Sequence, residues 1–211
     1  ASGKALGFGS QAISTAVGTG FIKDGPGAWS LAGSTYAGGF TLNAGTLAVG
    51  GVNAMGAGGT LAINGGTIKA GANGYLSANS VVRFANVAGA QLDLNGTTQS
   101  VATLEGAGAT GGAVLLGLNG ELTVGANSAF GGSVDGSGIS KLIKSGTGSF
   151  TMGPTSALTG TVAVNVNNGT LSFGGNAGAN ITANVASGAI LGGSGTFLGT
   201  VNVANGGTVQ A

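Results

Sequence analysis

An internal repeat is the feature that most constrains how this chain can fold. The segment NVNNGTLSF at residues 165–173 has close relatives in NVASGAIL at 184–191 and NVANGGTVQ at 202–210, so an Asn-Val pair returns at nearly regular intervals. Two earlier segments, LNAGTLAV at 42–49 and INGGTIKA at 63–70, repeat at a similar interval. A period of about 20 residues is typical of solenoid coils, which bury their apolar side chains by stacking on one another.

A longer duplication relates residues 21–51 to residues 142–175. The openings of the two copies are FIKDGPGAWSL and LIKSGTGSFTM, and their closes are NAGTLAVGG and NNGTLSFGG, with a short insertion between opening and close in the second copy. Because two copies of one pattern bracket the middle of the chain, we expect residues 1–211 to form a single repeating domain. The aligned residues of the openings are Lys23 and Lys144, Gly25 and Gly146, Gly27 and Gly148, and Trp29 and Phe150.

Short strands separated by glycine turns account for most of the sequence. Segments such as TLAV, TLAI, QLDL, ELTV, TVAV, TLSF and TVNV alternate apolar with small or polar residues, which is the pattern of a half-buried strand. Asn-Gly, Gly-Gly and Ser-Gly pairs lie between them and supply the positive φ that sharp corners need. No apolar stripe with helical spacing persists, so we expect at most one short helical turn.

The composition agrees with a folded all-β chain. Of the 211 residues, 48 are glycine, 2 are proline, 42% are hydrophobic and 5% are charged, with a net charge of +1. Disordered chains show the opposite balance, and collagen needs glycine at every third position. The sequence therefore predicts a parallel β-helix of roughly ten coils, with Leu, Ile, Val and Phe inside and Thr, Ser, Asn and Ala facing solvent. Leu171 and Ile190 are two of the expected core positions.

The longer duplication resembles the passenger-associated repeat of bacterial autotransporters. That repeat opens with Leu-x-Lys-x-Gly-x-Gly-x-Leu, continues through a threonine- and glycine-rich middle, and closes with Asn-x-Gly-Thr-Leu. Residues 88–108 and 119–138 are similar to the segments between such repeats, so the resemblance covers nearly the whole chain. The second copy matches at Leu142, Lys144, Gly146, Gly148, Phe150, Asn167, Gly169, Thr170 and Leu171. The first copy matches at Phe21, Lys23, Gly25, Gly27, Trp29, Asn43, Gly45, Thr46 and Leu47.

The resemblance implies a right-handed parallel β-helix that is exported and presented at the outer membrane by a C-terminal β-barrel. This sequence shows neither the barrel pattern nor a signal peptide at its start, so we interpret it as a passenger segment. No window approaches the roughly 18 consecutive apolar residues of a transmembrane helix. Passengers of this family include adhesins, aggregation factors, toxins and some enzymes, so the fold alone does not select a function.

Few residues are suited to catalysis. The chain has no histidine and no cysteine, which excludes thiol chemistry and Ser-His pairs. A glycosidase needs two carboxyl groups within about 5 to 10 Å, and Glu105 and Glu121 are the pair that one coil could bring together. Isolated solubilising charges are the simpler interpretation, and we expect no catalytic or cofactor-binding residue. The carboxylates are Asp24, Asp93, Glu105, Glu121 and Asp135.

Other ligand classes also find little support. The glycine-rich segment at residues 106–112 lacks the Lys-Ser/Thr and the helix of a phosphate-binding loop, so a chain corner is expected there. Calcium-binding repeats need an aspartate in every coil, and we expect no metal site. Lys141, Lys144 and Arg83 form no basic run, so nucleic acid is not an expected partner.

Side chains outside these motifs have structural interpretations. The aromatic residues Trp29, Phe40, Phe150 and Phe173 occupy strand positions and are expected in the core, whereas Tyr36 and Tyr75 lie near glycine corners and are expected at the surface. Asn165, Asn184 and Asn202 are expected to form a ladder of side-chain amides along one corner. An ice-binding face is the weakest alternative, because no Thr-x-Thr column is continuous; the threonines considered are Thr41, Thr60, Thr151, Thr161, Thr200 and Thr208.

Together these observations predict an adhesive rod that spaces or presents binding surfaces and assists its own secretion by coil stacking. The expected partners are a host or matrix protein or a glycan. Self-association in aggregation or biofilm is the first alternative, through open coil edges near Ala1 and Ala211. A polysaccharide-processing enzyme is the second alternative.

Overall fold

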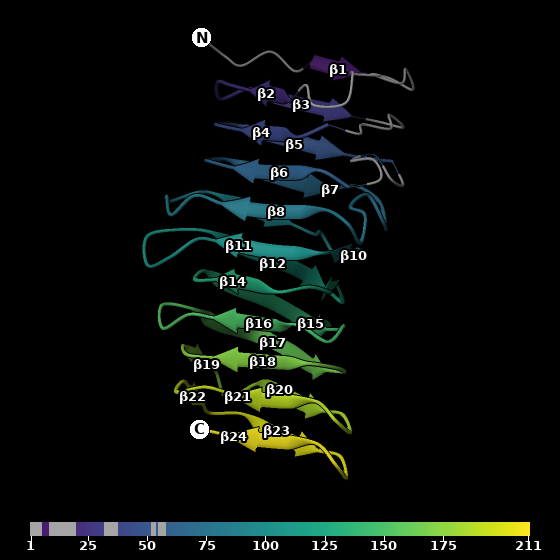
Figure 1. Cartoon of the computed structure of the whole chain (residues 1–211). Coiled ribbons are helices and arrows are strands. Elements are labelled where there is room, and N and C mark those ends of the chain that lie inside the picture. The colour runs from purple at the N-terminus through teal and green to yellow at the C-terminus, as the bar shows by residue number, and fades with distance from the viewer. Residues whose placement is uncertain (1–5, 9–19, 32–37, 52–53, 55–57) are drawn as a thin grey trace.

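The chain forms a stack of parallel β-strand coils (Figure 1). The computed structural model describes residues 6–8, 20–31, 38–51, 54 and 58–211. Within these ranges all regular secondary structure is β-strand, and the strands pair in parallel in two long sheets, so the predicted parallel β-solenoid is confirmed. The ten strands of the smaller sheet follow one another along the stack, one to a coil.

Both sheets run the length of the stack. The ten-stranded sheet consists of β2 (Phe21–Lys23), β4 (Phe40–Leu42), β6 (Thr60–Ile63), β8 (Val81–Phe84), β11 (Thr103–Gly106), β14 (Ser128–Phe130), β16 (Ser149–Met152), β18 (Thr170–Phe173), β21 (Ile190–Gly192) and β24 (Thr208–Gln210). The main path of the fourteen-stranded sheet consists of β1 (Leu6–Phe8), β3 (Ala28–Leu31), β5 (Thr46–Val49), β7 (Thr67–Ala70), β9 (Gln91–Asp93), β12 (Ala113–Leu118), β15 (Ser133–Lys144), β17 (Ala157–Val166), β19 (Asn176–Ala177) and β22 (Thr196–Phe197). Its other four strands are β10 (Thr98–Val101), β13 (Glu121–Val124), β20 (Ile181–Val185) and β23 (Thr200–Val203).

The larger sheet carries two strand segments in each of the later coils. The register of β15 against β17 shifts between Gly136 and Ser140, where the strand passes around an edge of the rod. The first half of β17 pairs with β19, and the second half pairs with β20. Each of these later coils therefore contributes one strand to the ten-stranded sheet and two strand segments to the fourteen-stranded sheet.

The two copies of the duplicated motif enter the stack differently. In the first copy the motif runs from β2 in the ten-stranded sheet, around a glycine corner, to β3 in the fourteen-stranded sheet. In the second copy it runs from the end of β15 in the fourteen-stranded sheet to β16 in the ten-stranded sheet. The same sequence motif thus turns at two different edges of the rod.

Within each copy, the close of the motif stacks on its opening. Thr46 pairs with Ala28 in one copy, and Thr170 pairs with Ser149 in the other. The stretch of chain from the opening to the close of the motif is therefore one coil.

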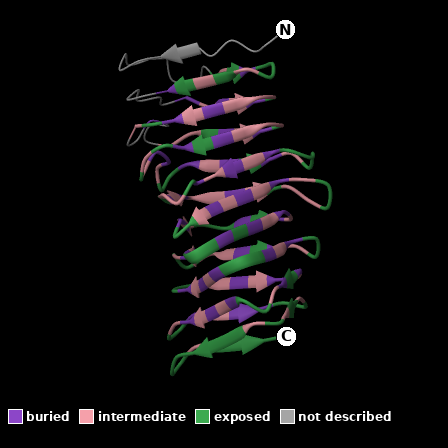
Figure 2. Ribbon diagram, turned by 180° about the vertical axis from the view of Figure 1, so that it is seen from behind, coloured by how far each residue is buried: buried purple, intermediate pink, exposed green. Residues whose placement is uncertain are grey.

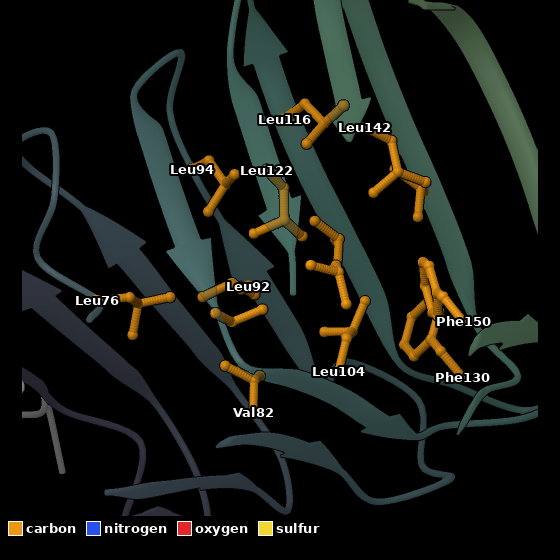
Figure 3. Close-up of a cluster of buried hydrophobic side chains, with 14 of the residues drawn as sticks. Leu76, Val82, Leu92, Leu94, Leu104, Leu116, Leu122, Phe130, Leu142 and Phe150 are labelled. Atoms are coloured by element: carbon orange, nitrogen blue, oxygen red, sulfur yellow. The ribbon is translucent and has the colours of Figure 1, made fainter. Parts of the chain in front are cut away.

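Apolar side chains fill the space between the sheets, as expected from the alternating pattern. Buried and more exposed residues alternate along the strands (Figure 2), and the close-up of the central coils shows leucine, valine and phenylalanine side chains gathered inside the stack (Figure 3). Leu171 is buried as predicted. The prediction for Ile190 is wrong, because this side chain is only half-buried and its neighbour Leu191 is the core residue of β21.

The aromatic predictions are correct for most strand positions. Phe40, Phe150 and Phe173 are buried, and the half-buried Trp29 packs against the core. The prediction for Tyr75 is wrong, since its side chain is fully buried and its hydroxyl has no hydrogen-bond partner in the described part of the chain. The corner at residues 71–80 is long enough to fold a side chain inward. Tyr36 lies outside the described residues.

Candidate functional site

Each of the five carboxylates contacts the neighbouring coil. Three form ion pairs with directly opposed cations: Glu105 with Arg83 at 2.9 Å, Glu121 with Lys141 at 3.1 Å, and Asp93 with Lys69 at 3.9 Å. Two accept hydrogen bonds from uncharged side chains: Asp24 from the Asn43 amide and Asp135 from the Thr159 hydroxyl, both at 2.6 Å. These acids therefore connect successive coils.

Glu105 and Glu121 are not brought together as a pair. Glu105 lies on β11 of the ten-stranded sheet and Glu121 on β13 of the fourteen-stranded sheet, and each is bonded to its own cation. Among the described residues, no three His, Cys, Asp or Glu side chains gather into a potential metal site. The arrangement leaves Glu105 and Glu121 as separate carboxylates, each paired with a cation.

Two lysines occupy the core, one in each copy of the duplicated motif. Lys23 and Lys144 have 0% and 1% of their surface exposed. The Lys23 ammonium donates to Gly25 O at 3.0 Å and to Ala44 O of the next coil at 2.7 Å, and it lies 5.7 Å from the centre of the Trp29 ring. The Lys144 ammonium donates to the carbonyls of Ser145 and Gly146.

Burial determines the protonation behaviour of these two lysines. Desolvation lowers the pKa of Lys144, and it lowers the pKa of Lys23 against a smaller opposing effect of Asp24. Backbone carbonyls compensate part of the desolvation, because they are good acceptors for an ammonium. Sequence reasoning matches these lysines to the family pattern but misses their burial, although each stands at an inward position at the end of its strand.

The glycine corners stack closely on one another. A Cβ atom at Gly169 would lie 2.3 Å from the carbonyl oxygen of Gly148, and a Cβ at Gly45 would lie 2.4 Å from that of Gly27. In both copies, the glycine of the motif's close therefore sits directly on the opening's corner. The segment at residues 106–112 is also a corner, as predicted; Gly108 and Gly111 bridge each other across it, and Thr110 bonds to Asn86.

The predicted asparagine ladder is present. Asn184 Nδ2 donates to Asn165 Oδ1 at 2.8 Å, and Asn202 Nδ2 donates to Asn184 Oδ1 at 3.0 Å. The ladder lies on strands β17, β20 and β23, where these residues are register partners, and not at a corner as expected. No threonine column extends from Thr41 or Thr151, because their register partners are Ile, Ala and Ser.

A shallow depression lies on the outer face of the ten-stranded sheet. It has a volume of about 680 Å³ and spans β11, β14 and β16, with Glu105, Asn127, Ser149 and Thr151 at its margin and Gly106 and Ala129 in its lining. β11 pairs with β14 only at Glu105 and Gly106, so the two strands are in register over two residues there. Sequence patterns give no signal for this depression, since its residues come from three coils.

No helix in the described ranges is long and apolar enough to cross a membrane.

Comparison with known proteins agrees with this architecture. The model of the passenger-associated transport repeat matches residues 21–49 and 142–173. The chain is 38% identical over 111 residues to the adhesin BmaC autotransporter of Brucella suis biovar 1 (strain 1330), an alignment that covers 51% of this chain and 3% of that relative. The chain thus spans a small part of the length of this relative. No solved structure matches the present chain.

Proposed function

We propose an adhesive, rod-like role for this chain, which belongs to the repeat-bearing passenger domains of autotransporters. In this role the chain is exported, exposed at the cell surface, and holds binding surfaces away from the outer membrane. The observation that carries the proposal is the continuous parallel stack in which both transport repeats are embedded. A relative named as an adhesin supports the same role.

The distribution of carboxylates favours binding over catalysis. Hydrolysis of a glycosidic bond uses two carboxyl groups that flank the bond. Here Glu105 and Glu121 lie on different sheets, and each of the five acids contacts an adjacent coil. We therefore assign the outer faces to recognition, with a host or matrix protein or a glycan as the partner.

Coil stacking also gives a means of assisting secretion. Each coil that stacks outside the cell buries apolar surface on the coil before it, which opposes return of the chain. The test is to display the chain on bacteria and to compare Leu171→Asp with Ser172→Asp. These neighbours lie on β18, with Leu171 buried and Ser172 half-buried.

We expect the buried aspartate to reduce surface display strongly and the half-buried one to leave it nearly unchanged, because only the former places a charge in the core. Antibody labelling of intact cells measures display, and adhesion of the displaying cells to cultured host cells measures the binding role. Equal display of the two variants would contradict the stacking mechanism. Display of the unaltered chain without a gain in adhesion would contradict the adhesive role.

A further inference from the structure

The side chains at the margin of the depression on the ten-stranded sheet each keep at least one polar atom without a hydrogen bond to the described residues. Arg83 donates through Nε and Nη2 to Glu105 Oε2, so Glu105 Oε1 accepts no hydrogen bond from the described residues. Asn127 Oδ1 accepts from the Ser149 backbone N–H at 2.8 Å, while its Nδ2 has no partner in the same ranges. The hydroxyls of Ser149 and Thr151 likewise make no side-chain hydrogen bond within the described chain.

This arrangement differs from the asparagine ladder and from the contacts of Asp24 and Asp135. The amides of Asn165, Asn184 and Asn202 bond to one another, and Asp24 and Asp135 are bonded to adjacent coils. Around the depression, one free carboxylate oxygen, one amide with two N–H donors and two hydroxyls face the same space. Such a set matches a ligand with several hydroxyl groups, each of which both donates and accepts.

The shape and charge of the depression narrow the ligand further. Gly106, Ser128 and Ala129 are the small residues of its lining, so a sugar ring can approach the backbone there closely. Three neighbouring strands at a spacing of about 4.8 Å give a width of about 10 Å. Arg83 compensates the charge of Glu105, so the site carries no net charge. These features favour an uncharged sugar over an acidic or basic one.

We propose that this depression binds an uncharged oligosaccharide. Glu105 Oε1 on β11 and Asn127 Nδ2, directly before β14, bond to the hydroxyls of the sugar. The side-chain hydroxyls of Ser149 and Thr151 on β16 bond to further hydroxyls of the same sugar. The second carboxylate needed for hydrolysis is not in the lining, so the sugar is bound and released unchanged. The site rests on the proposed adhesive function and gives that function a ligand class.

The test is a titration of the purified chain with cellohexaose, chitohexaose and maltohexaose, monitored by nuclear magnetic resonance. We expect at least one hexasaccharide to bind at millimolar concentration, with shifts confined to residues around the depression. Glu105→Gln should weaken binding by about tenfold, because it removes a charge-assisted hydrogen bond of about 1.4 kcal/mol. Asn127→Ala should weaken binding to a similar extent without altering the Arg83–Glu105 pair.

Glu121→Gln is the matched control. Glu121 is also paired with a cation on the neighbouring coil, but it lies on the other sheet, so its replacement should leave the affinity unchanged. Circular dichroism checks that each variant is folded. The proposal is overturned when no hexasaccharide binds, or when Glu105→Gln and Glu121→Gln weaken binding equally while Asn127→Ala has no effect.

Cell adhesion separates this proposal from the function it rests on. Adhesion by the unaltered chain without any hexasaccharide binding overturns the sugar site and leaves the adhesive role standing. Sugar binding by a chain that confers no adhesion supports the site and overturns the adhesive role.

Discussion

Glycine positions with the same backbone conformation differ in how much room surrounds them. Gly169 and Gly188 have φ values of 68° and 76°, a region that side chains other than glycine rarely adopt. A Cβ at Gly169 would meet the Gly148 carbonyl oxygen at 2.3 Å, whereas a Cβ at Gly188 would meet no atom within 4 Å. The demand for glycine at Gly169 therefore comes from coil stacking as well as from φ.

Replacing these two glycines separates the cost of backbone strain from the cost of close coil stacking. Gly188→Ala should lower the free energy of unfolding by about 1 kcal/mol through backbone strain alone. Gly169→Ala should lower it by about 2 kcal/mol more, because the methyl group must displace a backbone carbonyl. Urea denaturation measures both variants, and equal costs would show that the close approach at Gly169 relaxes freely.

The buried lysines make a prediction about alkaline pH. Their pKa values are lowered in the folded state, so on raising the pH the folded chain loses these protons before the unfolded chain does. The free energy of unfolding should therefore rise with pH between the lysine pKa in the folded chain and the value of 10.5 in the unfolded chain. Below that range the buried lysines should lower the free energy of unfolding. Tyr75 acts in the opposite direction above about pH 10, because burial raises its pKa.

Urea denaturation from pH 8 to about pH 10 tests this prediction. The double variant Lys23→Met and Lys144→Met should lose the rise in stability. Lys141→Met is the control, since this lysine lies at the surface with 43% of its side chain exposed, and the variant retains both buried lysines. A rise of the same size in the double variant would rule out the buried lysines as its source.

Among the strand elements, β17, β20 and β23 are connected by the asparagine ladder. Asn184 is its central member and takes part in both of its amide bonds. Asn184→Ala should lower the free energy of unfolding by about 1 to 2 kcal/mol, the net value of two hydrogen bonds. Thr182→Ala, on the same strand, is the comparison because the Thr182 side chain has no hydrogen-bond partner in the described ranges. Urea denaturation of both variants gives the difference, and equal losses would assign no net stability to the ladder.

The alternation of strand residues makes the coil and its contents largely predictable from the sequence. Repeated segments determine the pairing, as Asn165, Asn184 and Asn202 show, because identical residues one coil apart become register partners. Predictions fail where the coils depart from this regularity. Ile190 is predicted on the wrong side of its strand, and Tyr75 is predicted at the surface of a corner that folds inward.

The polar depression could not be predicted from the sequence for a different reason. Its margin combines Glu105, Asn127 and Ser149, which are distant in the sequence and belong to successive coils. Whether these side chains are free depends on bonds such as the one from Arg83 to Glu105, and those bonds follow from register and rotamer. A local sequence pattern predicts neither the register nor the rotamer.

At the scale of the whole molecule, stability is expected to depend mainly on contacts between adjacent coils. Strands pair with their nearest counterparts along the stack, and all five carboxylates act between neighbouring coils. Such a rod can open locally without losing the remainder of its structure. The predictions for Gly169, Asn184 and the buried lysines therefore each concern a limited part of the stack.

The different edges at which the two transport repeats turn affect how a partner meets them. The first repeat turns from the ten-stranded to the fourteen-stranded sheet, and the second turns in the reverse order. A flat surface lying along one side of the rod would face one corner and not the other. Although the sequence contains two copies of the corner, a molecule that recognises it would bind only one copy at a time and gain no avidity from the second, unless it wrapped around the rod.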